Sequence, residues 1–243
     1  MSLSHVFKHR SILSCFVLAI ALIAGGCSKD EPGPTGNQNP AGHTAPNPGS
    51  IYTFDGYNVD SAGTKLQGTD KHVIWTVAQN GLTYKGKTGV VKMIGDSKIG
   101  YFYHSPNGDL IGTLDASNSV ISGIWITYPF GSRTAFNYPA IDTVVPAQGG
   151  TARIQIFGTV TYIGEEDIVV GSETIKAQKI LDRMTQITDQ TGIPTTTLQL
   201  ENTLWYSPKV GYFVKQYTVM NTLFGTFGIR SRTVGNLTSY SRQ

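Results

Sequence analysis

The sequence predicts an all-β domain of antiparallel strands with at most one helix. Three observations predict this fold class. Residues that favour strands, above all Thr, Tyr, Val and Ile, dominate residues 51–243. Apolar residues in this part alternate with polar ones and do not recur at every third or fourth position. Turn signals rich in Gly, Pro and Asn separate the alternating segments.

The chain begins with the features of a secretory signal peptide. Its first ten residues include the basic side chains Lys8 and Arg10 and no acid. A mostly apolar stretch at 11–23 and the small residues 24–26 follow. This order is typical of a signal peptide, which we place at residues 1–26. The alternative is an N-terminal anchor helix, but the apolar stretch is shorter than the roughly 20 residues that cross a bilayer.

Cys27, which follows the small residues, is a candidate site of lipid attachment. The stretch Ile23-Ala24-Gly25-Gly26-Cys27 resembles the lipobox of bacterial lipoproteins, although Ala24 stands where Leu is commonest. The resemblance implies a diacylglycerol on the sulfur, cleavage just before the cysteine and acylation of the new amine with a fatty acid such as palmitate. Two or three acyl chains anchor a protein stably. A plain cleaved signal peptide with a free thiol is the alternative.

Lys29, Asp30 and Glu31 follow the cysteine after Ser28. This group is similar to the export signal of Bacteroidota-type surface lipoproteins, and Ser28 is not the Asp that favours retention in the inner membrane. The resemblance implies a lipid anchor in the outer membrane, with the domain at the cell surface or, as the alternative, at the periplasmic face. The other interpretation of the three residues is the charged start of a solvated linker.

Residues 27–50 form the predicted tether. Between 28 and 50 the chain holds five of its eleven prolines and no Val, Ile, Leu or aromatic residue. Such a segment buries too little apolar surface to offset its ordering entropy, so we expect a disordered tether. The antiparallel β domain then occupies residues 51–243.

Removal of the signal peptide changes the counts of charge and cysteine. Without Lys8 and Arg10 the chain has 17 basic and 16 acidic residues, so its charge gives no indication of nucleic-acid binding. Cys15 leaves with the signal peptide, and the expected lipidation occupies Cys27. No thiol then remains for a disulfide, a metal site or a nucleophile.

Strands are predicted wherever apolar residues occupy every second position, as they do in Arg153–Tyr162 and Thr196–Tyr206. Further strands are expected at His72–Val77, Thr88–Ile94, Ile99–His104, Asp109–Leu114, Ile121–Tyr128, Tyr212–Val219 and Phe227–Thr233. Turns are expected at Asn80-Gly81, Pro106–Gly108, Gly149-Gly150, Asp189–Gly192 and Pro208–Gly211.

The segment Glu173–Thr188 fits two secondary structures. Ile180, Leu181, Met184 and Ile187 have helical spacing, and the segment also fits a strand. Its Thr-rich flanks and the turn that follows favour the strand, and a single helix on the sheet is the alternative.

A short turn pattern occurs twice in the chain. Residues 103–108 (YHSPNG) and residues 205–211 (WYSPKVG) both read aromatic-x-Ser-Pro followed by a Gly-containing turn. The repetition permits two similar halves, at about 51–140 and 150–243. The alternative is a favourable hairpin turn that the chain uses twice.

The second half also resembles a group of known proteins. Residues 171–177 and 204–215, with a Thr-rich hairpin between them, look like uncharacterised secreted β proteins that share a WYSPxVGxxVK hairpin. These are similar in broad shape to the LolA/LolB half-barrels. The resemblance covers about Ile154–Val219 and implies a curved antiparallel sheet, a half-barrel with an apolar concave face; a sandwich is the alternative. It identifies no residue that contacts a ligand.

Residues that could perform catalysis are sparse. His72 and His104 belong to no metal-binding pattern, and no nucleophile elbow, phosphate loop or dinucleotide motif is present. The neighbouring acids Glu165, Glu166 and Asp167 are interpreted as the tip of a solvated loop. The sequence therefore predicts no catalytic residue, metal site or cofactor, and a protein that is not an enzyme.

Four aromatic residues are candidates for ligand binding: Trp125, Tyr128, Trp205 and Tyr206. Each lies in a predicted strand, where a buried ring is the common case, and an exposed stacking platform for sugars is the alternative.

The sequence therefore predicts a lipid-anchored, non-catalytic binding or structural module of the cell envelope. The first alternative is a LolA/LolB-like carrier or sensor of an apolar ligand, and the second is a glycan-binding accessory protein of a surface uptake system. Expected partners are the membrane, through the lipid on Cys27, an apolar or glycan ligand, and another envelope protein. Nucleic acid is not an expected partner.

Overall fold

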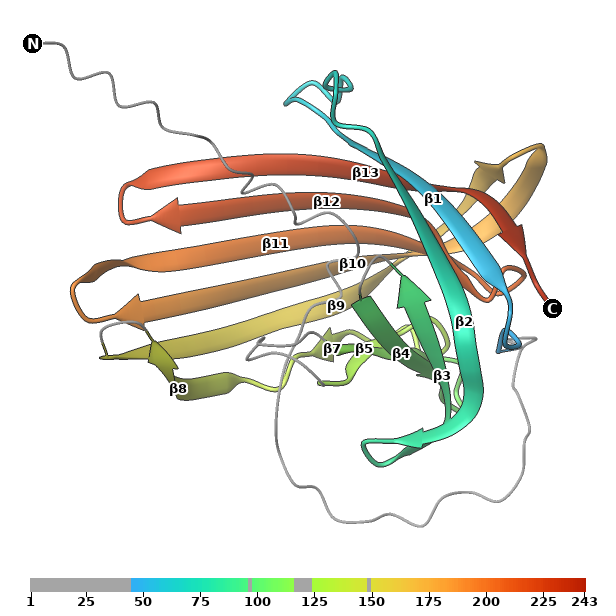
Figure 1. Cartoon of the computed structure of the whole chain (residues 1–243), viewed down its shortest axis with the longest axis horizontal. Helices are drawn as coiled ribbons and strands as arrows, with labels where there is room; N and C mark the ends of the chain where they lie inside the picture. Colours follow the sequence, from blue (N-terminus) through green and yellow to red (C-terminus); the bar gives the residue numbers. More distant parts are fainter. Residues whose placement is uncertain (1–44, 96–97, 116–123, 148–149) are drawn as a thin grey trace, which may run out of the picture.

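The structure, a computed structural model, describes residues 45–95, 98–115, 124–147 and 150–243. The predicted signal peptide, Cys27 and the charged group Lys29–Glu31 lie outside the described residues. The described residues form strands, turns and irregular segments, and none of them is helical, which confirms the all-β prediction (Figure 1). Nothing in these ranges forms a helix with the length and hydrophobicity that a membrane span needs.

Within the described ranges, thirteen strands form one antiparallel sheet. Their bounds are β1 Ile51–Asn58, β2 Lys71–Tyr84, β3 Lys87–Gly95, β4 Lys98–His104, β5 Leu110–Asp115, β6 Ile126–Tyr128, β7 Phe136–Asn137, β8 Ile141–Ala147, β9 Gly150–Val170, β10 Glu173–Gln190, β11 Ile193–Ser207, β12 Tyr212–Phe224 and β13 Phe227–Ser241.

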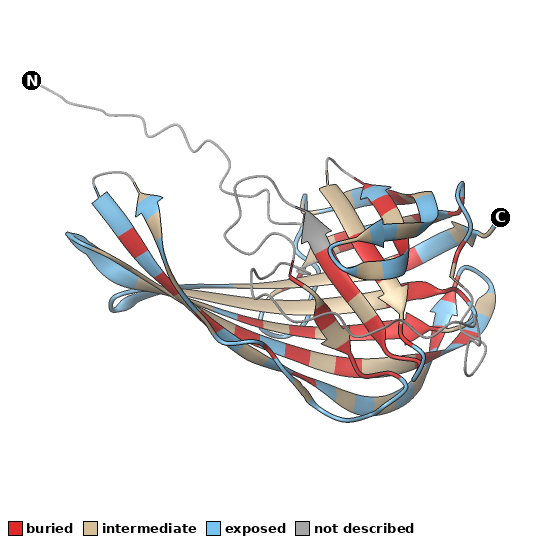
Figure 2. Cartoon of the chain, turned by 90° about the horizontal axis from the view of Figure 1, so that it is seen from below, coloured by how far each residue is buried: buried red, intermediate tan, exposed pale blue. Residues whose placement is uncertain are grey.

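The sheet consists of two meanders that β1 joins. Strands β2 to β6 pair in sequence order, as do β9 to β13, and β1 lies between β2 and β13. β7 and β8 pair with the outer edge of β9. The sheet curves so that β2–β6 face the inner side of β9–β13, which gives the half-barrel visible in Figures 1 and 2. The predicted curved antiparallel sheet is therefore confirmed.

The segment with two possible structures is a strand. β10 pairs with β9 on one side and with β11 on the other along most of its length. Ile180 and Met184, whose spacing also fitted a helix, are both even-numbered, so they share the inner face of the strand and are buried. The helix alternative is therefore wrong.

Three other expectations need correction. Asn80-Gly81 is not a turn, because it lies within β2, where the pairing with β3 is irregular. The turn lies at Lys85-Gly86, with φ of 44° and 75°, values typical of a tight hairpin. Glu165–Asp167 lies within β9, where acids on a long, partly exposed strand pair with basic residues of β10. Of the predicted strand Ile121–Tyr128, only the last three residues form one, and 121–123 lie outside the described residues.

The first described residues are part of the fold. The backbone N–H of Gly49 donates to the carbonyl of Val77 at 2.9 Å, and the N–H of Val77 donates to the carbonyl of Ser50 at 2.9 Å. The Asn80 side chain also donates to Asn47 at 3.3 Å. Residues 45–50, placed in the tether by their composition, thus join the sheet beside β2.

Both copies of the repeated turn occupy equivalent places. Each connects the third strand of a meander to the fourth: β4 to β5 in the first copy and β11 to β12 in the second. Gly108 and Gly211 both have positive φ, and their N–H groups donate back to the carbonyls of Ser105 and Ser207 at 2.9 and 2.8 Å. The turn chemistry expected from the sequence is confirmed at both sites.

Candidate functional site

Two of the four candidate aromatics lie in the core. Tyr128 and Tyr206 are 1% and 0% exposed on the inner face of the sheet. Tyr206 stacks on Phe130 with ring centroids 4.7 Å apart, and Tyr128 meets Phe213 edge-on at 5.7 Å. Their rings are therefore not open to a ligand from solvent.

Trp205 is buried on the opposite face of the sheet. The amines of Lys179 and Lys215, which flank it on β10 and β12, lie 4.9 and 4.6 Å from its ring centroid. Its indole N–H donates to Glu166 at 2.9 Å, and this bond is the main reason that the pKa of Glu166 lies below its usual value. Trp205 is therefore enclosed by its own neighbours.

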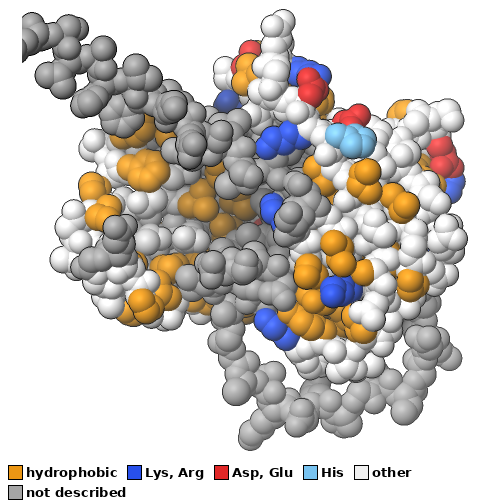
Figure 3. Space-filling model, in the orientation of Figure 1, with side chains coloured by type: hydrophobic (Ala, Val, Ile, Leu, Met, Phe, Trp, Pro, Cys, Tyr) orange, Lys and Arg blue, Asp and Glu red, His pale blue; other side chains and the backbone are white. Residues whose placement is uncertain are grey.

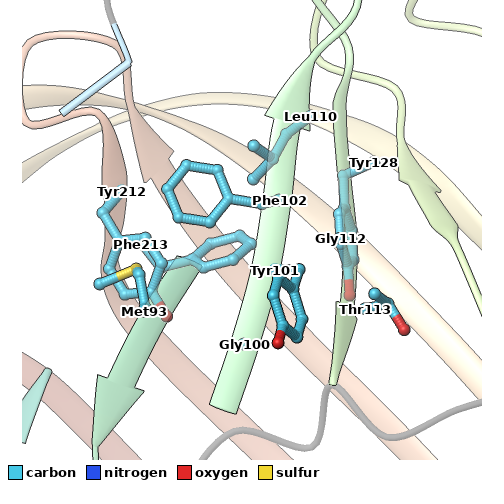
Figure 4. A pocket seen from close by; sticks show the side chains of 10 residues that line it. All are labelled: Met93, Gly100, Tyr101, Phe102, Leu110, Gly112, Thr113, Tyr128, Tyr212 and Phe213. Carbon is cyan, nitrogen blue, oxygen red and sulfur yellow. The ribbon is translucent and has the colours of Figure 1, made fainter. Parts of the chain in front are cut away.

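Buried side chains pack together on the inner face where β2–β6 lie over β9–β13 (Figure 1). A small hollow of about 20 Å³ lies where β4 and β5 carry Gly100 and Gly112, and Figure 4 shows the rings of Phe102, Tyr128 and Phe213 among the side chains around it. This volume is about that of one water molecule and far below the several hundred Å³ of a ligand pocket. The hollow has no room for an acyl chain.

A row of polar side chains crosses the inner face between the apolar layers. The Tyr138 hydroxyl donates to Asp182, and the Asn202 amide donates to the other carboxylate oxygen of Asp182 at 3.4 Å. The Thr218 hydroxyl then donates to Asn202 at 2.8 Å. Burial raises the pKa of Asp182 to about 6. The side chains of this row hydrogen-bond to one another within the protein. We therefore interpret the row as a structural network and not as an open site.

The fourth candidate, Trp125, belongs to a half-exposed cluster on the outer face of β4 and β5. Tyr84 stacks on Tyr101 with centroids 3.8 Å apart, and Trp125 meets both Tyr84 and Tyr103 edge-on at 6.0 Å. The amines of two lysines lie over tyrosine rings. We call this cluster the aromatic–lysine ledge and define it as Tyr84, Lys85, Lys87, Tyr101, Tyr103 and Trp125.

The β2–β3 hairpin builds the ledge by folding onto the outer face. The tight turn at Lys85-Gly86 places the Lys85 amine 5.6 Å from the Tyr84 centroid and the Lys87 amine 5.4 Å from the Tyr103 centroid. The indole N–H of Trp125 donates to the Lys85 carbonyl at 3.2 Å, which ties the hairpin to the segment before β6. The hairpin therefore contacts β4 through Tyr103 and the segment before β6 through Trp125.

The ledge lies in a basic part of the domain. Between residues 71 and 104 the sequence has five lysines, and Asp96, outside the described residues, is its one acid. The ion pairs among the described residues do not include Lys85, Lys87 or Lys92. Figure 3 shows basic side chains among apolar ones at the lower right, over β2 and β3. The ledge combines stackable rings with positive charge.

Of the residues in this cluster, Trp125 was predicted from the sequence as a candidate, and the others were not. The turn expected at Asn80-Gly81 would have ended the strand before Tyr84. The signal that could have identified them is the stretch Tyr84-Lys85-Gly86-Lys87, because a glycine between two lysines after a tyrosine is itself a hairpin turn sequence.

A second hollow lies on the outer face of β10–β13. It has a volume of about 340 Å³ and is mostly polar. Arg183 donates to Glu201 at 2.9 Å, and Asn221 donates to Gln199 at 3.2 Å, so four of its polar side chains already bind one another. The ledge therefore offers more unpaired charge than this groove.

The two histidines lie on opposite faces of the sheet. His72 is exposed and lies 2.7 Å from Asp55, whereas His104 faces inward, with Nε2 3.3 Å from the Tyr206 hydroxyl. The described ranges contain no group of three or more His, Cys, Asp or Glu side chains that could hold a metal ion.

Comparisons with known proteins give no family. No protein-family model and no curated protein matches the chain. Among solved structures, the hypothetical lipoprotein YmcC of Escherichia coli K12 aligns with 81% of this chain and 90% of that chain, with 10% sequence identity and a TM-score of 0.35. A similarity this weak assigns the chain neither a family nor a function.

Proposed function

We propose that this chain is a lipoprotein of the bacterial outer membrane, anchored through Cys27, whose β domain is a non-catalytic module that binds at its surface. The observation that carries the anchor is the sequence order: a basic head, an apolar stretch, small residues and Cys27. The tether that follows, up to about residue 44, leads directly to the folded domain.

The packed core between β2–β6 and β9–β13 supports a role for the surface of the domain. A carrier of an apolar ligand needs a lined cavity, and the hollow beside Gly100 and Gly112 has a volume of only about 20 Å³. The aromatic–lysine ledge, in contrast, presents half-buried rings and unpaired lysines on the outside. We therefore favour the ledge as the binding surface over the carrier alternative.

The anchor is tested by the mass of the N-terminal peptide. Protein purified from membranes should begin at Cys27 and carry a diacylglycerol on its sulfur and an acyl group on its amine. The Cys27→Ser variant should lose the lipid and leave the membrane fraction. A mature chain that begins elsewhere, or an unmodified Cys27, would refute the anchor.

Exposure at the cell surface is tested separately. Replacement of Lys29, Asp30 and Glu31 by alanines should leave the protein in the outer membrane but protect it from protease added to intact cells. Equal digestion of the two proteins would show that these residues are linker only. Protection of the unaltered protein would place the domain at the periplasmic face.

A glycan-binding accessory protein is the second candidate, favoured by the half-exposed rings of Tyr84, Tyr103 and Trp125. Aromatic faces stack on the apolar faces of sugars. Calorimetry with neutral oligosaccharides tests this function, and Trp125→Ala should abolish any heat of binding. A heat that persists in the variant would place the sugar elsewhere.

A further inference from the structure

The tether enters the fold beside the hairpin that carries the ledge. Its last residues bind β2 at Val77 and Asn80. Lys85 follows Asn80 along the same hairpin, at most about 17 Å away at 3.3 Å per residue. The point of attachment to the membrane and the ledge are therefore at the same end of the domain.

The opposite end of the sheet lies much farther from the tether. β13 runs from Ser241, which pairs with Ile51, to Phe227, a length of about 46 Å at 3.3 Å per residue. The disordered tether predicted from the composition would have a root-mean-square span of about 23 Å between Cys27 and Ala45. The exposed apolar side chains at that end, including Phe224 and Phe227, thus lie farther from the point where the tether joins the fold than the tether itself spans.

The composition of the ledge fits a membrane interface. Trp and Tyr concentrate at the headgroup level of bilayers, because their rings are apolar and their N–H and O–H groups are polar. Lysines beside them attract anionic headgroups. None of the ion pairs among the described residues includes Lys85, Lys87 or Lys92. Positive charge here remains available to a partner.

The other half of the domain shows how an anion occupies such a cluster. Glu166 accepts from the Trp205 indole at 2.9 Å and from the Lys179 amine at 3.2 Å, with the amines of Lys179 and Lys215 lying over the Trp205 ring. Aromatic rings and lysines in this protein thus hold an oxyanion at hydrogen-bond distance. The ledge has the same kinds of side chain without such an internal carboxylate among the described residues.

We propose that the aromatic–lysine ledge docks on the anionic headgroups of the membrane that holds the tether, so that the domain lies against the bilayer. This docking rests on the lipid anchor proposed above. It gives the protein a second membrane contact with a fixed orientation, in which β2–β4 face the lipid and β10–β13 point away from it.

Tryptophan fluorescence in reconstituted vesicles tests the docking. Full-length protein purified from membranes is inserted into phosphatidylcholine vesicles with or without phosphatidylglycerol, both with brominated acyl chains as quenchers. Trp75 and Trp205 are buried, so Trp125 is the accessible reporter. We expect quenching in vesicles that contain phosphatidylglycerol, weaker quenching at high salt, and its loss in Trp125→Phe.

Charge variants with a matched control show which surface docks. Lys85→Glu/Lys87→Glu should weaken docking at least about 30-fold, since each lysine near an anionic surface contributes roughly a factor of five to six. Arg230→Glu/Arg232→Glu changes the net charge equally on β13 and should leave the quenching unchanged. Flotation with the vesicles should be the same for all three proteins.

The outcomes separate the docking from the anchor. Flotation without quenching of Trp125 overturns the docking and leaves the anchor intact. Loss of quenching in the arginine variant instead of the lysine variant also overturns it, because another surface then meets the bilayer. Binding of a soluble acidic polysaccharide to the ledge, with no quenching in vesicles, replaces the lipid by a glycan. A chain that does not float with phosphatidylcholine vesicles refutes the anchor and the docking together.

Discussion

Asp182 should make the stability of the domain depend on pH. The side chain lies on the inner face of β10, where the residue is 2% exposed, and it accepts hydrogen bonds from Tyr138 and Asn202. Burial disfavours its charged form and raises the pKa from 3.8 to about 6, although both hydrogen bonds act in the opposite direction. Burial raises the pKa of both Tyr128 and Tyr138 well above 10, so these neighbours stay neutral in this range.

The direction of the effect follows from where the proton binds. Between about pH 4 and pH 6 the folded state holds a proton on Asp182 that the unfolded chain has released. Protonation therefore stabilises the fold fully below about pH 4, and the contribution disappears as the pH rises through 6. A difference of roughly two pH units corresponds to about 3 kcal/mol of unfolding free energy.

The Asp182→Asn variant removes this titration and keeps the size of the side chain. Urea unfolding of both proteins at pH 4, 5, 6 and 7 gives two curves whose difference isolates Asp182, since other groups titrate alike. Relative to the variant, the unaltered protein should lose about 3 kcal/mol from pH 4 to pH 7. Tyr138→Phe removes one bond to the carboxylate and should extend the loss to higher pH. If the unfolding free energies of the unaltered protein and of Asp182→Asn changed equally with pH, the reasoning would be refuted.

Three further predictions concern local packing. In Gly131→Ala the new Cβ would lie 1.8 Å from the Asn107 carbonyl oxygen, so it should destabilise the domain by more than about 2 kcal/mol in thermal unfolding; Ser132→Ala beside it should cost less than about 0.5 kcal/mol. Trp205→Ala should cost about 3–5 kcal/mol in urea unfolding, because it empties a buried site and leaves its neighbours unpaired. Trp125→Ala should cost less than half as much, since that ring is half-buried, and equal costs would contradict the burial assigned to the two rings.

Alternation predicted much of the sheet because one face of most strands is buried. The strands expected around Ile154 and Leu200 are present as β9 and β11. The helical spacing of Ile180 and Met184 was ambiguous because positions four apart also share a strand face. Strand bounds were less accurate, since several strands extend beyond the core and their exposed ends carry polar residues such as Glu165.

Contacts and pairing between strands explain why the sequence could not assign the candidate site. Trp205 and Tyr206 face opposite sides of β11, and both are buried, because Lys179, Lys215 and Glu166 cover Trp205 on the outer face. Irregular pairing within β2 carries the strand past Asn80 to Tyr84. Such contacts and irregularities depend on other strands, and a pattern along one strand does not contain them.

The repeated turn relates the ledge to Trp205. When the two copies are aligned on Ser-Pro, His104 corresponds to Tyr206, and these side chains meet at 3.3 Å in the core. Tyr103 corresponds to Trp205, and both rings face outward beneath lysine amines. The interpretation of two similar halves stays a prediction, and a favourable turn used twice is the alternative. On the first interpretation the ledge is the open counterpart of a cluster that Glu166 closes, and an anionic partner supplies what the first half lacks.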